Sequence, residues 1–287
     1  MFESPVKIRD LILFSFFSFM VIFFVFLSSF FDQRTKIVFC DVGQGDAAYI
    51  RIKNKIDVLI DAGPDKKVLS CLGKYMPFWD RKIELAFLSH PNRDHYNGYF
   101  FILDRYQIDK FITVDSPIVS KTYKKLLKKI SEKKIKIEEA FAGKIIQAVQ
   151  PRRLDEAKFV IFWPPKKFTS NNDNDFSSVI LFNGVLFTGD ASPFVLGRLS
   201  HGAIGKVDIL KIPHHGSKNG LTKKFLDLAD PKVAVISVGK NNSYGHPSNI
   251  VLDMLEAKKT NIRRTDRDGD IVFKIPSSKL QDTNNVQ

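Results

Sequence analysis

The sequence predicts a layered α/β domain over residues 32–276, preceded by one transmembrane helix over residues 11–31. Beyond residue 32, short runs rich in β-branched and aromatic residues alternate with helical segments, as expected for strands and helices packed in layers. The composition, with 44% hydrophobic and 26% charged residues in a chain of 287, is that of an ordinary globular protein. The third observation is an uncharged apolar run before the first strand.

That apolar run, residues 11–31, contains no Asp, Glu, Lys or Arg and is long enough to cross a bilayer as a helix. A secretory signal peptide has a shorter apolar core of roughly 7–15 residues. Ser29 nevertheless offers a cleavage position, so both an anchor and a cleaved signal stay open. Lys7 and Arg9 precede the run, which places residues 1–10 in the cytoplasm and the domain outside the membrane. We therefore expect a single-pass membrane protein, or a secreted one if the segment is removed.

The pattern after the apolar run predicts secondary structure in the following order. Strands are expected at residues 36–41, 47–53, 57–61, 85–89, 110–114, 144–149, 158–162, 178–182, 185–188, 207–212, 233–238 and 271–275. Helices are expected at residues 66–75, 94–106, 120–133, 193–200, 222–229 and 247–258. Residues 277–287 are expected to form a disordered tail.

The formal net charge of +13 belongs to the part after the apolar run, because the charges of residues 1–31 cancel. Such a charge favours contact with nucleic acid, anionic lipid or an anionic envelope polymer, and does not choose among them. Cys40 and Cys71 lie far apart in the chain, without the spacing of a metal-binding pair.

The strongest chemical signal is a group of possible metal ligands between a predicted strand and a predicted helix. His90, Asp94 and His95 fall within six positions directly after the strand that ends at residue 89. Such a junction holds short side chains toward one cavity, and imidazole and carboxylate groups suit a divalent transition metal. An isolated histidine would more often be a surface or core residue, but two His and an Asp in one turn favour a metal site.

Further polar residues follow other apolar strands. Asp61 ends one strand, Asp190 follows another and the pair His214-His215 follows a third. Each alone could be a turn former, but together they predict a site along one rim of the sheet. His246 precedes a predicted helix start, where backbone amides favour an anion, so it could contact a phosphate.

These residues resemble the metallo-β-lactamase superfamily, and within it the extracytoplasmic domain of the ComEC-like competence family. The resemblance covers about residues 36–275 and is carried by five blocks, FCDVGQGDA (39–47), SHPNRDHYNG (89–98), FTGD (187–190), PHHGS (213–217) and YGHP (244–247). It implies an αββα sandwich with a nuclease-like phosphodiesterase site that holds one or two divalent ions, Mn or Zn. Membership of a fold family does not by itself fix the reaction.

The resemblance also implies a role for each site residue. The metal ligands would be His90, Asn92, Asp94, His95, Asp190 and His214, with Asp190 between the two ions. Asp94, Asp190 and His246 would act in catalysis. Asp61 would orient a histidine ring, and His215 and Ser217 would support the site or contact substrate. The His214-His215 pair leaves open which of the two is the ligand.

The sequence departs from the family pattern at two positions. Asn92 stands where the superfamily has His, and an amide oxygen brings no charge to a first metal position. The histidine expected between the two halves is also missing, and Asn174 or Asp175 could take its place. An oxygen-rich first position would favour Mn²⁺ or Mg²⁺ over Zn²⁺, or leave one ion tightly bound.

Three functions fit these observations. The leading hypothesis is a membrane-anchored nuclease that acts on DNA outside the membrane, beside a separate DNA-uptake channel protein or as a scavenging enzyme. The second is a phosphodiesterase of an envelope polymer or a small molecule. The third is a degenerate, non-catalytic fold that binds DNA. Cleavage of DNA separates the first two, and metal content separates both from the third.

Overall fold

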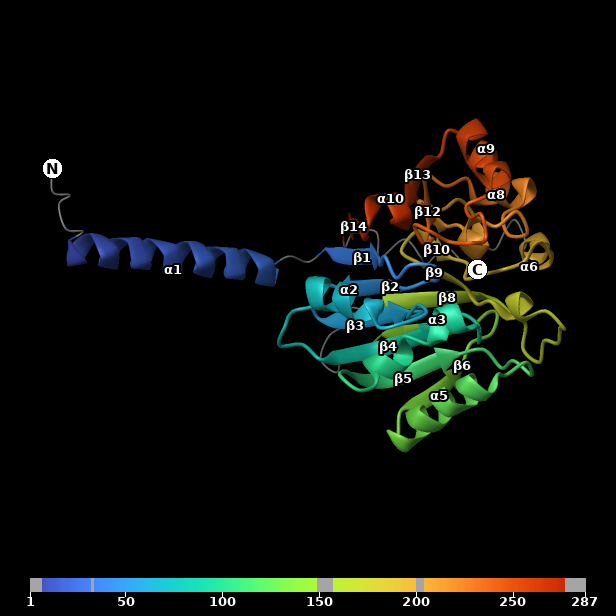
Figure 1. Ribbon diagram of the computed structural model, residues 1–287, viewed down its shortest axis with the longest axis horizontal. Helices are drawn as coiled ribbons and strands as arrows, with labels where there is room; N and C mark the ends of the chain where they lie inside the picture. The colour runs from blue at the N-terminus through green and yellow to red at the C-terminus, as the bar shows by residue number, and fades with distance from the viewer. Residues whose placement is uncertain (1–6, 32–33, 149–156, 200–203, 277–287) are drawn as a thin grey trace.

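The computed structural model describes residues 7–31, 34–148, 157–199 and 204–276, and shows one extended helix followed by a two-sheet domain (Figure 1). The first sheet has the order β14-β1-β2-β3-β4-β5-β6 and the second the order β13-β12-β11-β10-β9-β8-β7. The first sheet contains β1 (Thr35–Phe39), β2 (Ala48–Ile52), β3 (Ile56–Ile60), β4 (Lys82–Leu88), β5 (Gln107–Thr113), β6 (Lys136–Glu139) and β14 (Ile271–Ile275). The second contains β7 (Ile145–Ala148), β8 (Ala157–Trp163), β9 (Val179–Phe182), β10 (Val185–Phe187), β11 (Ile209–Lys211), β12 (Val233–Ile236) and β13 (Asn261–Arg264).

Helices cover the outer faces of both sheets. The α-helices are α1 (Ile8–Phe31), α2 (Lys67–Tyr75), α3 (Arg93–Tyr96), α4 (Tyr99–Ile102), α5 (Lys121–Glu132), α6 (Pro193–Arg198), α8 (Lys223–Ala229), α9 (Asn249–Ala257) and α10 (Thr265–Asp268). Two 3-10 helices complete the described elements, η1 (Asp173–Phe176) and η2 (Pro213–Gly216).

The domain has three apolar cores among its described residues. One lies between the two sheets, and one lies between each sheet and the helices that cover it. In β3, Val58 and Ile60 face the opposite sheet, whereas Leu59 packs toward the helices with Val68 of α2. Side chains alternate in this way because successive residues of a strand point to opposite faces. Both faces of the strand are therefore apolar, and the expected αββα sandwich is confirmed.

The strand ends bring the polar residues to one rim. β3 and β4 are parallel, so Asp61 and Ser89 emerge together at their carboxyl ends. β10 and β11 are parallel in the second sheet, so Asp190 and the turn of η2 emerge together as well. A hydrogen bond from the Ser178 N–H to the Ser89 carbonyl, 2.9 Å long, joins the two sheets at this rim.

The main differences from the predicted elements have local causes. The sequence pattern does not reveal β6 or β13, because no residue of these two edge strands is fully buried and neither has an apolar run. The helix expected at residues 94–106 is two short helices, α3 and α4, that meet at Gly98. A Cβ at Gly98 would lie 1.9 Å from the Ala62 carbonyl oxygen, so this close backbone approach requires glycine.

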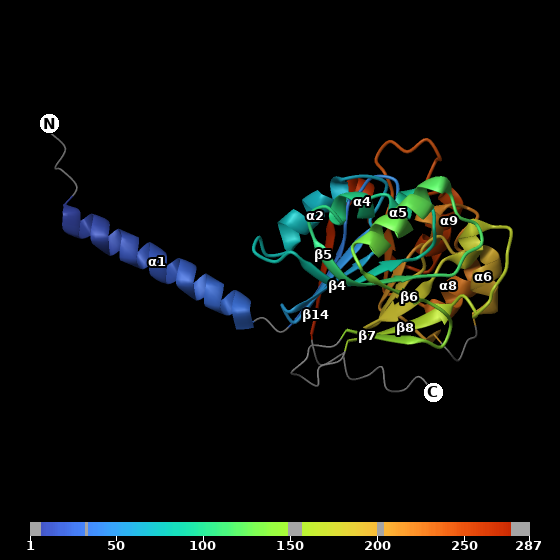
Figure 2. The ribbon, with the colours of Figure 1, turned by 90° about the horizontal axis from the view of Figure 1, so that it is seen from below.

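The N-terminal helix α1 extends away from the domain on the side where β1 begins (Figures 1 and 2). Its apolar side chains between Ile8 and Phe24 are largely exposed. Within the described part of the chain, no helix has both the length and the apolar character that crossing a membrane requires. Part of the expected span, including residues 28–31, has side chains outside the described set, and so does the expected tail at 277–287.

A disulfide that the sequence pattern did not reveal joins Cys40, directly after β1, to Cys71 in α2. The two Cα atoms are 5.8 Å apart and both side chains are buried. Because the residues are 31 positions apart, their pairing depends on how α2 folds back onto the first sheet. The bond fixes the start of the loop that carries Asp46 to the rim.

Candidate metal centre

Four side chains from both sheets meet at the rim. Asp94 and His95 come from α3, Asp190 follows β10, and His215 lies in η2. Each offers one ligand atom, and these atoms all lie within 4.8 Å of one another. His95 Nε2 is 3.3 Å from Asp190 Oδ1, and His215 Nε2 is 3.2 Å from Asp94 Oδ2. We call these four residues the rim cluster. Two carboxylates and two imidazoles suit a divalent transition metal.

Hydrogen bonds to Nδ1 fix the orientation of the His95 and His215 rings. His95 Nδ1 donates to Asp61 Oδ2 over 2.9 Å, and His215 Nδ1 donates to the Ser237 carbonyl oxygen over 2.9 Å. A carbonyl oxygen can only accept, so the proton of a neutral His215 sits on Nδ1. In its neutral form each ring therefore turns an Nε2 lone pair toward the carboxylates, as metal-binding histidines do.

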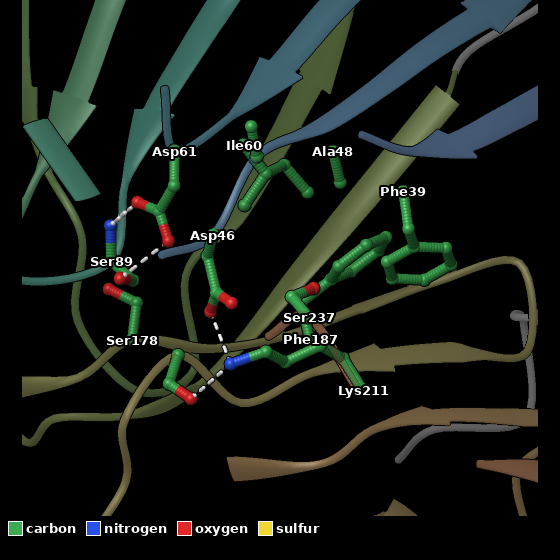
Figure 3. A pocket seen from close by; sticks show the side chains of 12 residues that line it. Phe39, Asp46, Ala48, Ile60, Asp61, Ser89, Ser178, Phe187, Lys211 and Ser237 are labelled. Atoms are coloured by element: carbon green, nitrogen blue, oxygen red, sulfur yellow. Dashed lines mark hydrogen bonds and ion pairs between the residues drawn. The ribbon is translucent and has the colours of Figure 1, made fainter. Parts of the chain in front are cut away.

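Asp61 is itself held in place. Its carboxylate accepts from the Ser89 N–H at 2.7 Å and from the Ser89 hydroxyl at 2.8 Å, as Figure 3 shows. Asp61 has a φ of +59°, and His214 and His215 have φ values of +52° and +54°. Non-glycine residues rarely adopt such left-handed backbone, and it often marks functional sites.

Beneath the rim cluster lies a buried ion pair between Asp46 and Lys211 (Figure 3). Asp46 Oδ1 is 3.3 Å from His215 Nδ1, and Lys211 Nζ is 3.8 Å from Asp190 Oδ1. Lys211 also donates to the Gly189 carbonyl over 2.8 Å. The cavity around this pair is about 10 Å³, room for about one water molecule. The ion pair thus supports the rim cluster from inside the domain. The cluster is open to solvent on the side of Asp94, whose side chain is 35% exposed.

Sequence reasoning assigned no role to Asp46 or Lys211. Asp46 stands in one of the family-like blocks, and Lys211 interrupts the apolar run of β11. A lysine in a buried strand is rare unless it is paired. This position of Lys211 was the feature of the sequence that could have indicated a buried ion pair. The loop that carries Asp46 requires glycine at position 45, where a Cβ would lie 2.3 Å from the Asp94 carbonyl oxygen.

The electrostatics of the rim favour a positive charge. Burial by itself lowers the pKa of His215, but Asp190 and Asp46 outweigh it and raise that pKa to about 10. Burial likewise opposes protonation of His95, but Asp190 and Asp61 hold its pKa well above the usual value. Burial would raise the pKa of Asp190, yet His215 and His95 hold it well below its usual range. The Asp190 carboxylate therefore stays ionised and attracts a cation.

A second group of predicted ligands lies beside the rim cluster. His90 is fully buried, its Nδ1 is 3.0 Å from the Ser89 hydroxyl, and burial lowers its pKa to about 3. Asn92 donates to Asn174 Oδ1 over 3.2 Å, and Asn174 Nδ2 is 3.3 Å from His214 Nδ1. His214 Nε2 is 3.9 Å from Asp190 Oδ2. This second group, His90, Asn92, Asn174 and His214, supplies no carboxylate of its own.

The remaining predicted residues have different surroundings. Asp175 accepts from Ser170 over 2.6 Å and from Asn172 over 3.2 Å, so its carboxylate fixes the turn of η1. Ser217 accepts from the Asn219 N–H at 3.2 Å. The His246 ring lies 5.8 Å from the His214 ring, at the outer edge of the rim. Tyr244, 69% exposed, stacks against it.

Unsatisfied polar atoms test whether a metal fits here. Among the described residues, the buried atoms His90 Nε2, His95 Nε2 and Asp190 Oδ1 form no hydrogen bond of acceptable geometry, although His95 Nε2 and Asp190 Oδ1 lie 3.3 Å apart. A buried polar group without a partner costs roughly 1–3 kcal/mol. The His95 and Asp190 atoms lie within the rim cluster. A divalent ion would satisfy both, so the donor set fits a metal.

The chain belongs to the metallo-β-lactamase superfamily, whose family model matches residues 40–240. Its fold is that of metal-dependent hydrolases, and the rim cluster is a group that could hold their ion. ComE operon protein 3 of Bacillus subtilis (strain 168) is 26% identical over 280 residues, which cover 88% of this chain and 35% of that protein. Recombination protein 2 of Haemophilus influenzae is 28% identical over 279 residues, covering 92% of this chain and 32% of that protein.

The expected resemblance to the ComEC-like branch is confirmed by these relatives. The chain spans about a third of their length. Among solved structures, the metallo-β-lactamase fold protein YhfI from Bacillus subtilis matches with a TM-score of 0.56 at 13% identity, covering 84% of this chain and 99% of that one. A diphosphatase from the PhnP family matches with a TM-score of 0.50 at 13% identity, covering 84% and 98%. Both similarities support the fold alone.

Replacing Lys211 by methionine is expected to lower the free energy of unfolding by about 3–5 kcal/mol, because the buried Asp46 then loses its lysine partner. Urea denaturation of the purified protein measures this. The double variant Asp46→Asn/Lys211→Met removes both charges and should recover most of the loss. A single variant as stable as the wild type would show that the pair contributes nothing.

Proposed function

We propose that this protein is a membrane-anchored, metal-dependent phosphodiesterase that cleaves DNA outside the membrane. The observation that carries the proposal is the convergence of Asp94, His95, Asp190 and His215 on one point of the rim. The buried atoms His95 Nε2 and Asp190 Oδ1 form no hydrogen bond of acceptable geometry among the described residues. A divalent ion bound there would polarise a phosphoryl oxygen and lower the pKa of a water molecule.

In this proposal the residues of the rim have three roles: they bind the ion, orient the histidine rings and contact the substrate. Asp94, His95, Asp190 and His215 hold the ion, while Asp61 and the Ser237 carbonyl keep the two rings in the tautomer that presents Nε2. His246 and His214 lie at the outer edge, where they can contact a substrate phosphate. The exposed ring of Tyr244, stacked on His246, offers a surface for a nucleobase.

DNA is favoured as the substrate by charge and by the relatives. A formal net charge of +13 attracts a polyanion. One of the two relatives, that of Haemophilus influenzae, carries the name of a recombination protein. The partner of this protein in the proposal is a separate DNA-uptake channel protein. A phosphodiester of an envelope polymer or a small molecule is the alternative substrate.

The location outside the membrane is supported by two features. The disulfide Cys40–Cys71 fits an oxidising compartment, since disulfides are rare in the cytosol. The helix α1 carries exposed apolar side chains, among them Phe14, Phe17 and Ile22. Such side chains are stable in lipid, so we propose that α1 holds the domain at the membrane.

The proposal is tested with the purified chain in detergent. The chain is stripped of ions with a chelator, supplied with Mn²⁺ or Zn²⁺, and incubated with single-stranded DNA. We expect cleavage that needs the ion and is absent in the variant Asp190→Asn. Hydrolysis of a small phosphodiester without cleavage of DNA would favour the alternative substrate. No hydrolysis with any ion, together with less than one bound ion per chain, would favour the non-catalytic fold.

The number of ions gives a separate prediction. We expect one tightly bound ion per chain, because the second group, with His90 and Asn92, lacks a carboxylate. The variant Asn92→Asp adds that charge and should raise the metal content toward two, measured by elemental analysis after dialysis. Asn261→Asp, which adds the same charge on the exposed β13, is the control and should bind one. Two ions in the wild type would contradict the prediction.

A further inference from the structure

The edge of the domain opposite the rim lies close to the end of α1. Residues 32–34 separate Phe31, where α1 ends, from Thr35, where β1 begins. An extended chain spans at most about 3.6 Å per residue, so Thr35 lies within about 14 Å of the end of the helix. If α1 is held in a membrane, the amino-terminal edge of the first sheet must therefore lie near the membrane surface.

The same edge carries the loop between α2 and β4. β1 and β3 each run antiparallel to β2, and β3 and β4 run parallel, so the starts of β1, β3 and β4 lie together. The residues just before β4, 76–81, thus project from the edge at which β1 begins. In both Figure 1 and Figure 2 this loop points to the side from which α1 leaves the domain.

Two large aromatic side chains stand exposed on this loop. Phe78 is 79% exposed and Trp79 is 62% exposed, and their rings pack edge to face with centroids 4.8 Å apart. Adjacent Phe and Trp rings held out into water are unfavourable for a protein surface that faces solvent alone. Tryptophan in particular is enriched at the headgroup level of membranes, where one side of the ring is apolar and the other wet.

Basic residues lie at the same edge of the domain as the aromatic pair. Lys53 and Lys55 lie in the turn between β2 and β3, Arg81 follows the aromatic pair, and Arg105 precedes β5. Three acidic groups of this edge are paired within the fold: Asp80 with Arg51 at 3.2 Å, Asp104 with Lys129 at 2.6 Å, and Asp109 with Lys82 at 2.7 Å. The loops of this edge thus present positive charge beside apolar rings, which fits an anionic lipid surface.

We propose that Phe78 and Trp79 insert into the headgroup region of the lipid bilayer beside α1, while Lys53, Lys55, Arg81 and Arg105 contact anionic lipid. This rests on the membrane anchoring proposed for α1. The contact sets the orientation of the whole domain. β4 is seven residues long, about 23 Å, and the rim lies at its far end. The metal centre then faces away from the membrane, open to substrate from outside.

The two tryptophans of the chain allow a direct test. Trp79 lies in the exposed loop, whereas Trp163, at the end of β8, is 5% exposed and packs against Phe168. The full chain is reconstituted into vesicles of phosphatidylcholine and phosphatidylglycerol, with or without bromine on the acyl chains close to the headgroup. Tryptophan fluorescence is compared between the two kinds of vesicle, and vesicle flotation checks that the chain is bound.

Bromine quenches only tryptophan that it can touch, so the variants separate the two rings. The variant Trp163→Phe, which reports Trp79 alone, should lose about half of its emission in brominated vesicles, as expected for a ring at headgroup level. The wild type should be quenched less, since Trp163 also emits. The matched variant Trp79→Phe should show no quenching. α1 contains no tryptophan, so its own insertion gives no signal.

The outcomes distinguish this inference from the proposed function. If the chain floats with the vesicles and Trp79 is not quenched in either the wild type or Trp163→Phe, the inference is wrong and the anchor stands. If the chain does not float, the anchor and the inference are both overturned. Cleavage of DNA by the detergent-purified chain is measured independently and is not affected by either result.

Discussion

Replacing His95 by alanine is expected to lower kcat/KM for phosphodiester cleavage by more than the roughly 10–100-fold that loss of a residue supporting a metal ligand costs. His95 is the most connected group of the site. Its Nε2 lies 3.3 Å from Asp190 Oδ1, and its Nδ1 lies 2.9 Å from Asp61 Oδ2. Its removal would take away one donor to the ion and leave Asp61 buried without its ring partner. Steady-state kinetics on a model phosphodiester, with metal content measured in parallel, checks the prediction.

A graded series separates the ligand from its support. Asp61→Asn keeps an acceptor for the His95 ring but loses the charge, so we expect a smaller loss, within the roughly 10–100-fold range. Ser131→Ala, at an exposed position of α5 outside the rim cluster, is the control and should leave kcat/KM close to the wild type. Activity that survives both His95→Ala and Asp190→Ala would overturn the assignment of the rim cluster as the catalytic centre.

Reduction of the disulfide is expected to lower the free energy of unfolding by about 3–4 kcal/mol, because the bond closes a loop between residues 31 positions apart and restricts the unfolded chain. A loss of this size is a large part of the stability of a typical domain. Urea denaturation with and without a thiol reductant, at fixed metal concentration, measures the difference.

The variant Cys40→Ala/Cys71→Ala controls for other effects of the reductant. It should have lowered stability under both conditions, with no further change when the reductant is added. Both cysteines are buried, and alanine in their place avoids burying a hydroxyl group. Equal stability of the oxidised and reduced wild type would show that the bond does not contribute to the fold.

Much of the layout of the site could be predicted because its determinants are local. Apolar runs predicted the strands. Three polar residues follow the ends of three of these strands: Asp61 after β3, Ser89 after β4 and Asp190 after β10. The expectation that such strand ends share one rim of the sheet then predicted that these residues lie close together. The metal-binding and catalytic roles of these residues stay predictions.

The sequence by itself determined which residues stand at the rim, since a strand and its first turn are fixed by neighbours in the chain. Only the tertiary structure decided how they meet. His214 and His215 are adjacent, and the left-handed backbone at both, together with the Ser237 carbonyl, turns His215 into the rim cluster. Asp46 and Lys211 are 165 positions apart, by the difference of their residue numbers, and they meet only when the two sheets pack. The bond between Cys40 and Cys71 likewise forms only when α2 packs on the first sheet. Such pairings depend on distances across the fold, which no local pattern of residues encodes.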